Sequence, residues 1–147
     1  MNDIEYKISN EDLRGLILGK KLGSGIHRDV FEYKQDNNLV IKCSIEYPNI
    51  NILEFEVWLM VKDTQISKWF APCIDISPCG MYLIQKKIEI RPESEYPKLV
   101  PSFFDDLKYS NYGWIKDKFV CCDYAGFIAS SMSHKWSGKL KKVEWWE

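Results

Sequence analysis

Residues 16–43 read LILGKKLGSGIHRDVFEYKQDNNLVIKC, and this stretch decides the fold. It contains three runs rich in aliphatic, β-branched and aromatic residues, which suit a pleated surface. Gly23-Ser24-Gly25 separates the first two runs, and Asp36-Asn37-Asn38 separates the last two. Both separators have the composition of turns. The pattern predicts three consecutive antiparallel strands over residues 16–22, 29–34 and 39–43.

The chain continues with one helix and further strands. Pro48 precedes the helix, and Asn51 is its expected N-cap. Ile52, Phe55 and Leu59 then recur at helical spacing. Later strands are expected at residues 74–76, 81–85 and 118–123. The sequence predicts an α+β fold, in which one helix covers a five-stranded antiparallel sheet and a small C-terminal part follows.

Length and composition limit the class of protein. The 147 residues suit one domain, residues 1–147. A net charge of -1 argues against a nucleic-acid partner. A polar N-terminus and short apolar runs predict neither a secretory signal nor a membrane segment. Five cysteines, an odd number without metal-ligand spacing, indicate the reducing cytoplasm and no zinc site.

Two features of the predicted strands could serve a phosphate ligand. Gly23 and Gly25 let a backbone approach a phosphate closely, although a plain hairpin turn uses the same residues. Lys42 lies on the third strand between apolar neighbours, where a lysine is unusual unless that strand edge faces water. A glutamate on the helix, Glu54 or Glu56, could hold the Lys42 ammonium in position.

A third feature lies further along the chain. Asp106 and Asn111 are five positions apart in an expected loop, and Asp123 ends a short apolar strand. Carboxylate and amide oxygens are the ligands that magnesium prefers. Each of these residues is also a common turn former, so the combination and its order carry the interpretation.

In this combination and order the chain resembles the protein-kinase-like superfamily, in particular the compact kinase-like proteins of bacteria and their phages. The resemblance covers about residues 16–126. It includes a glycine-rich loop, a third-strand lysine, a helix glutamate, a catalytic loop and an Asp-Phe-Gly-like segment. The corresponding residues here are Gly23-x-Gly25 with Val30, Lys42, Glu54, Asp106 with Asn111, and Asp123-Tyr124-Ala125.

The resemblance implies ATP as a ligand. The backbone near Gly23 and Gly25 would cover the phosphates, and Lys42, held by Glu54, would contact the α and β phosphates. The adenine would bond the backbone that follows the fifth strand. This bond would lie near Lys86 and Ile88, with Gln85 at the mouth of the pocket. Val30 would pack on the base.

The resemblance also implies a phosphotransferase. Asn111 and Asp123 would hold Mg²⁺, and Asp106 would act as the base toward an accepting hydroxyl of a protein or a small molecule. Residues 1–90 would form the part similar to the kinase N-lobe. Residues 91–147 would form a reduced C-lobe, too short for the helical platform that docks protein substrates.

Some positions depart from the family pattern. Arg28 stands at the third glycine of the loop, where it stiffens the loop or adds a phosphate contact. Phe104 and Asp105 replace the histidine and arginine that precede the catalytic aspartate. The missing C-lobe platform supports an alternative function, a catalytically inactive kinase-like module that engages or inhibits a partner protein, such as a host protein. A plain α+β domain with chance motifs is a third reading.

The C-terminal tail bears on the same alternative. It carries Trp136, Trp145 and Trp146. Tryptophan is enriched at the centres of protein interfaces, so these residues could contact a partner. They could equally cap the core of the domain itself. The sequence leaves the oligomeric state open.

Overall fold

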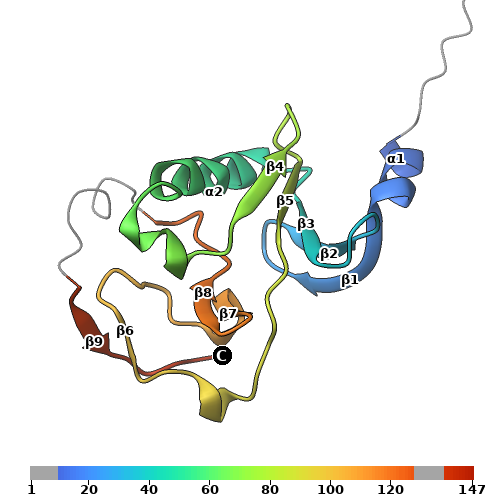
Figure 1. The fold of residues 1–147 in the computed structure, drawn as a ribbon. Coiled ribbons are helices and arrows are strands. Elements are labelled where there is room, and N and C mark those ends of the chain that lie inside the picture. The colour runs from blue at the N-terminus through green and yellow to red at the C-terminus, as the bar shows by residue number, and fades with distance from the viewer. Residues whose placement is uncertain (1–9, 128–137) are drawn as a thin grey trace, which may run out of the picture.

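The computed structural model describes residues 10–127 and 138–147. Its main feature is a five-stranded antiparallel sheet with the order β1-β2-β3-β5-β4 (Figure 1). The strands are β1 (Leu18–Ser24), β2 (Asp29–Tyr33), β3 (Leu39–Cys43), β4 (Cys73–Ile76) and β5 (Tyr82–Lys86). The predicted α+β class and the five-stranded antiparallel sheet are therefore confirmed.

The helix α2 (Pro48–Val61) packs against β4 and β5. The predicted N-cap was wrong, because the helix begins at Pro48 and Asn51 is a buried residue of its first turn. Proline suits this first position, since the first N–H groups of a helix have no partner within it. A further short helix, η1 (Gln65–Trp69), leads from α2 toward β4.

Two details of the first hairpin differ from the prediction. Residues 10–17 form a helix, α1 (Asn10–Ile17), so β1 begins two residues later than expected. The turn lies at residues 25–28, where the Gly25 N–H donates to the Arg28 carbonyl at 2.8 Å. Gly23 is a strand residue paired with Val30, and the register shifts on both sides of Lys21. Such shifts are bulges, which let one strand carry extra residues and twist.

The C-terminal half forms two small sheets below the main one (Figure 1). β7 (Tyr112–Ile115) and β8 (Lys118–Cys121) make a hairpin, and β6 (Leu99–Pro101) pairs with β9 (Leu140–Lys142). The other short helices are η2 (Glu93–Glu95) and η3 (Tyr109–Asn111). Only β8 among these strands was predicted, and the expected loop around Asn111 and Gly113 is largely strand β7.

Gly113 shows how closely the two halves approach each other. A Cβ atom there would lie 2.5 Å from Ile88 Cδ1 and 2.8 Å from the Glu89 carbonyl oxygen. The segment after β5 runs beside β7 at this point, and Glu89 and Trp114 exchange backbone hydrogen bonds of 2.7 and 3.0 Å. Only glycine leaves room for this contact, which fixes the linker against the C-terminal half.

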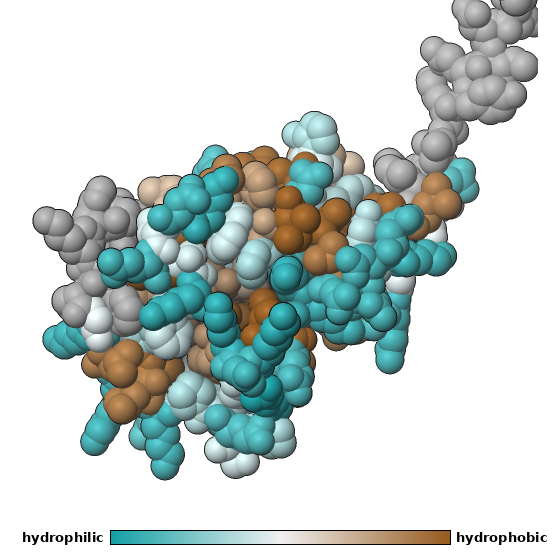
Figure 2. Space-filling view, viewed as in Figure 1, coloured by the Kyte–Doolittle hydropathy of each residue, from teal (hydrophilic) through white to brown (hydrophobic). Residues whose placement is uncertain are grey.

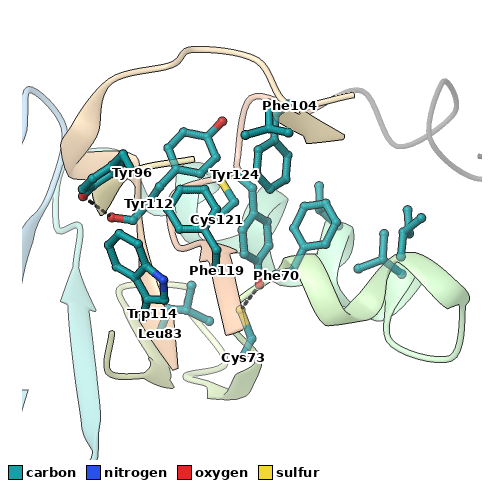
Figure 3. Packing of buried hydrophobic residues seen from close by; sticks show 14 residues of the cluster. Phe70, Cys73, Leu83, Tyr96, Phe104, Tyr112, Trp114, Phe119, Cys121 and Tyr124 are labelled. Carbon is teal, nitrogen blue, oxygen red and sulfur yellow. Dashed lines mark hydrogen bonds between the residues drawn. The ribbon is translucent and has the colours of Figure 1, made fainter. Parts of the chain in front are cut away.

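The largest apolar cluster joins α2, β5 and the C-terminal half, and aromatic rings fill much of it (Figure 3). A smaller cluster of Ile41, Cys43 and Tyr82 is packed by Ile17, Leu18 and Phe31. Trp145 packs against the large cluster and donates from Nε1 to the Pro97 carbonyl at 2.8 Å. Of the two expectations for Trp145, the structure thus shows a packing role.

The other two tail residues differ from Trp145. Trp146 is 50% exposed, and its backbone pairs with the segment from Leu107 to Tyr109. The prediction for Trp136 lies outside the described residues. Within residues 10–127 and 138–147, no helix has both the length and the apolar character that crossing a membrane requires.

Candidate functional site

A buried ion pair between Lys42 and Glu54 lies at the centre of the candidate site. Lys42 is a residue of the middle strand β3, and Glu54 lies on the inner face of α2. The Lys42 Nζ donates to Glu54 Oε1 and to the carbonyl of Cys122. Lys42 is 4% exposed and Glu54 is completely buried. Glu56, the other glutamate considered, is exposed.

Glu54 also holds the segment that follows β8. Its Oε2 accepts the backbone N–H of Tyr124 at 3.1 Å and that of Ala125 at 3.2 Å. A buried carboxylate is stable only when charges and hydrogen bonds replace its hydration. The contacts of Glu54 therefore tie together α2, β3 and the Asp-Tyr-Ala segment that contains Asp123.

Arg28 is the residue whose role the sequence did not settle. From the turn between β1 and β2 its guanidinium reaches Asn51 Oδ1 at 3.0 Å, Glu54 Oε2 at 2.5 Å and Asp123 Oδ1 at 2.8 Å. Its side chain is 8% exposed. The signal in the sequence was an arginine at a position where the family has glycine.

Asn51 orients Arg28 through a fixed amide group. Its Nδ2 donates to the carbonyls of Lys42, Gly80 and Met81 at 3.1, 2.9 and 3.0 Å. These bonds turn Oδ1 toward the guanidinium, since the amide carries both groups on one plane. Asn51 was mistaken for a helix cap because asparagine is a common capping residue.

The charges of Arg28 and Asp123 affect one another. Partial burial opposes ionisation of Asp123, but the charges of Lys42 and Arg28 outweigh it and hold the pKa of this carboxyl below its usual value. Burial likewise disfavours the Arg28 cation, and the carboxylates of Glu54 and Asp123 outweigh that effect, so the pKa of Arg28 is raised. Both groups are therefore charged at neutral pH.

The loop predicted to be catalytic lies beside this network. The Asn111 Nδ2 donates to the Asp106 carbonyl at 3.1 Å, and the Asn111 carbonyl accepts the Cys122 N–H at 2.8 Å. Asp106 is exposed and has a φ of 43°, a left-handed conformation that the local hydrogen bonds must hold. Phe104 is fully buried in the core. The structure thus brings the loop to the segment that contains Asp123.

The glycines of the first hairpin border open space. An added Cβ would meet nothing within 4 Å at Gly23, and only the Arg28 carbonyl at 3.5 Å at Gly25. Neither has a positive φ. These glycines are not required by local geometry, but they leave the backbone accessible from outside. Val30 pairs with Lys42 across β2 and β3.

The residues expected around the adenine differ in how deeply they are buried. Gln85 is completely buried and donates to the Ala71 carbonyl at 3.3 Å, so its expected position at the mouth of a pocket was wrong. Lys86 is exposed, and its N–H donates to the Pro72 carbonyl at 2.9 Å. Ile88 packs over Gly113. The Lys86 N–H is therefore used within the fold.

One of the two expected magnesium ligands already has a cationic partner. Asp123 Oδ1 accepts a hydrogen bond from Arg28, whereas the Asn111 amide bonds the Asp106 carbonyl through its nitrogen and a metal would use its oxygen. In the part of the chain that the structure describes, no group of three or more His, Cys, Asp or Glu side chains could hold a metal. A guanidinium takes the place beside Asp123 that the resemblance gives to Mg²⁺.

The cysteines near the site are neutral thiols. Burial raises the pKa of Cys73 to about 12 and that of Cys122 to about 12. Cys73 contacts the Tyr124 hydroxyl at 3.1 Å. Because the thiolate is the reactive form, these two thiols are packing residues and not nucleophiles.

Comparison with known proteins adds no family. No protein-family model matches the sequence, and no curated protein matches it.

Proposed function

We propose that the protein is a kinase-like nucleotide-binding protein that takes ATP at the Lys42–Glu54 site. The supporting observation is the convergence of residues far apart in the sequence. Lys42 is bonded to Glu54 and to the carbonyl of Cys122, beside the loop of Asp106 and Asn111. A chance set of motifs would have no reason to meet at one point.

Lys42 has the donor capacity that a phosphate contact requires. An ammonium carries three N–H donors, and the contacts with Glu54 and Cys122 use two of them. The third remains for a phosphate oxygen. Glu54 holds the ammonium in position, and Gly23 and Gly25 leave the hairpin backbone open to a ligand.

The exposed Asp106 supports phosphoryl transfer as the reaction. In this step the oxygen of an accepting hydroxyl bonds to the γ-phosphorus, and the bond from that phosphorus to the bridging oxygen of ADP breaks. The hydroxyl proton goes to the Asp106 carboxylate, and ADP leaves. The acceptor is a hydroxyl of a protein or of a small molecule.

Titration calorimetry of ATP against the wild type and Lys42→Met tests the binding. We expect the wild type to bind and Lys42→Met to bind about tenfold or more weakly, because a charge-assisted phosphate contact is lost. Lys118→Met, on the exposed start of β8, is the matched control and should bind like the wild type. A folded wild type that binds no ATP would overturn the proposal.

A second candidate function is the inactive module that engages a partner protein. The observation that favours it is the apolar surface of α2. The helix has two charged residues, and of these Glu54 is buried and Glu56 is exposed. Leu53, Leu59 and Met60 are each nearly half exposed. Figure 2 shows hydrophobic atoms along the edge of the molecule where α2 lies. Helices that are apolar on all sides are usually buried on all sides.

Turnover separates the two candidates. An enzyme with Asp106 as its base should keep ATP binding and lose phosphoryl transfer in Asp106→Asn. The inactive module should show no transfer in either protein, and should lose its partner when Leu53 and Met60 are changed to serine.

A further inference from the structure

The guanidinium of Arg28 occupies a built receptor. Its three acceptors come from two elements, Asn51 and Glu54 on α2 and Asp123 after β8. The Asn51 amide is fixed by three backbone carbonyls, and Glu54 is fixed by Lys42 and by two backbone N–H groups. A receptor of this kind holds the arginine as a permanent part of the site.

The charges of the site are balanced without a metal. Lys42 and Arg28 each carry one positive charge, and Glu54 and Asp123 each carry one negative charge. With the lysine alone, the two carboxylates would leave a net negative charge, which repels a triphosphate until a divalent cation is added. Arg28 removes this excess, so the site can accept an anion as it stands.

A metal ion at Asp123 would meet an unfavourable environment. The guanidinium nitrogen lies 2.8 Å from one oxygen of that carboxylate, so a divalent cation on the same group would face a like charge at close range. Moving Arg28 away would remove one partner of the buried Glu54 and leave the Asn51 oxygen without its donor.

We propose that Arg28 serves as a resident cation that replaces the divalent metal, and that the site binds a nucleoside triphosphate without Mg²⁺. This inference rests on the proposed nucleotide binding and adds the form in which the ligand is taken. A guanidinium has five N–H donors, and the bonds to Asn51, Glu54 and Asp123 use three. Arginine is well suited to phosphate because its donors match phosphate oxygens in pairs.

Titration of ATP in EDTA and in MgCl₂ tests the inference. The wild type should bind with affinities that agree within about twofold in the two buffers. Arg28→Gln should bind about tenfold or more weakly in EDTA, since a charge-assisted contact and one positive charge are lost. It should regain affinity in MgCl₂, because Asp123 is then free to take the ion.

Arg91→Gln is the matched control for loss of an arginine. Arg91 bonds Glu89 at 3.2 Å and the Lys116 carbonyl at 3.0 Å, and it packs over Trp114. This variant should bind ATP like the wild type in both buffers. If Arg91→Gln lost as much affinity for ATP, the effect of Arg28→Gln would come from the lower net charge of the protein, and the inference would be overturned.

Asp123→Asn provides a second variant in case Arg28→Gln does not fold. It removes a negative charge beside the proposed phosphate position and keeps an oxygen that can accept from Arg28. In EDTA it should bind ATP at least as tightly as the wild type. Loss of binding in this folded variant would overturn the inference.

The two proposals fail in different ways. A wild type that binds ATP only with Mg²⁺ would overturn the resident cation and leave the nucleotide site intact. A wild type that binds ATP in neither buffer would overturn both.

Discussion

The site around Lys42 and the aromatic cluster of the C-terminal half are held together by different forces. The first is a closed set of four charged side chains with few alternatives in geometry. The second is a set of packed rings (Figure 3). Within it the Tyr96 ring contacts four others, those of Tyr109, Trp114, Phe119 and Trp145. Ring packing tolerates many arrangements, whereas a buried charge tolerates only those that pair it.

This difference predicts how each region responds to substitution. Removal of a fully buried member of the charged set, such as Glu54, leaves its charged partners buried and unpaired, so a single substitution lowers stability by the whole penalty. Removal of one group from the aromatic cluster deletes one contact among many, so the penalty is graded. The predictions below compare the two regions, from the largest expected effect to the smallest.

The largest effect is expected for Glu54→Gln. The change leaves Lys42 and Arg28 without their shared buried carboxylate, and breaking such a pair lowers the free energy of unfolding by about 3–5 kcal/mol. The measurement is urea unfolding followed by tryptophan fluorescence. Glu56→Gln, on the exposed face of α2, is the control and should change stability by less than about 0.5 kcal/mol. An equal loss of stability in the two variants would contradict the role of Glu54 as the shared partner of Lys42 and Arg28.

A smaller effect is expected for Tyr96→Phe in the aromatic cluster. The ring stays, but the hydroxyl that donates to the Tyr109 and Tyr112 carbonyls at 3.0 and 3.1 Å is lost. Stability should fall by about 1–2 kcal/mol, the usual penalty for leaving a buried acceptor unpaired. Tyr47→Phe, where the side chain is about half exposed, is the control for loss of a hydroxyl. A loss as large as that of Glu54→Gln would refute the graded response.

The smallest effect is expected from the titration of Asp123. Its pKa is lower in the folded protein, so its ion pair contributes fully above the usual value of 3.8 and is lost as pH falls through the folded pKa. Because the side chain is 50% exposed, solvent limits the contribution to about 1 kcal/mol or less. Unfolding curves of the wild type and Asp123→Asn should differ above about pH 4 and converge below it. A constant difference down to pH 2 would exclude this titration as the cause.

The sequence predicted the main sheet because its signals are local. Strands alternate with turns at short intervals over residues 16–43, and each predicted pair is joined by a few residues. Lys42 was recognisable because a lysine among apolar strand residues needs a partner. Glu54 and Glu56 point about 200° apart around the helix, so only one of them can face the sheet. The choice stayed open because apolar residues occur on all sides of α2, and its pattern therefore does not mark the inner face.

The parts that the sequence did not predict depend on distant contacts. β6 and β9 are three residues each and exist because they pair across the C-terminal half. No local pattern distinguishes such strands from loops. Arg28 was ambiguous for the same reason, because its partner Asp123 is 95 residues away. The role of Asn51 depends on carbonyls from β3 and the turn before β5.

The long reach of Arg28 has a consequence for the kinetics of folding. The contact between Arg28 and Asp123 joins residues 95 positions apart and so closes a long loop. We expect it to form late in folding, because the chain must lose the entropy of that loop before the contact contributes any stability. Interactions that form after the transition state slow unfolding and leave the folding rate nearly unchanged. The link from the first hairpin to Asp123 is therefore expected to slow unfolding, and so to lengthen the lifetime of the folded protein.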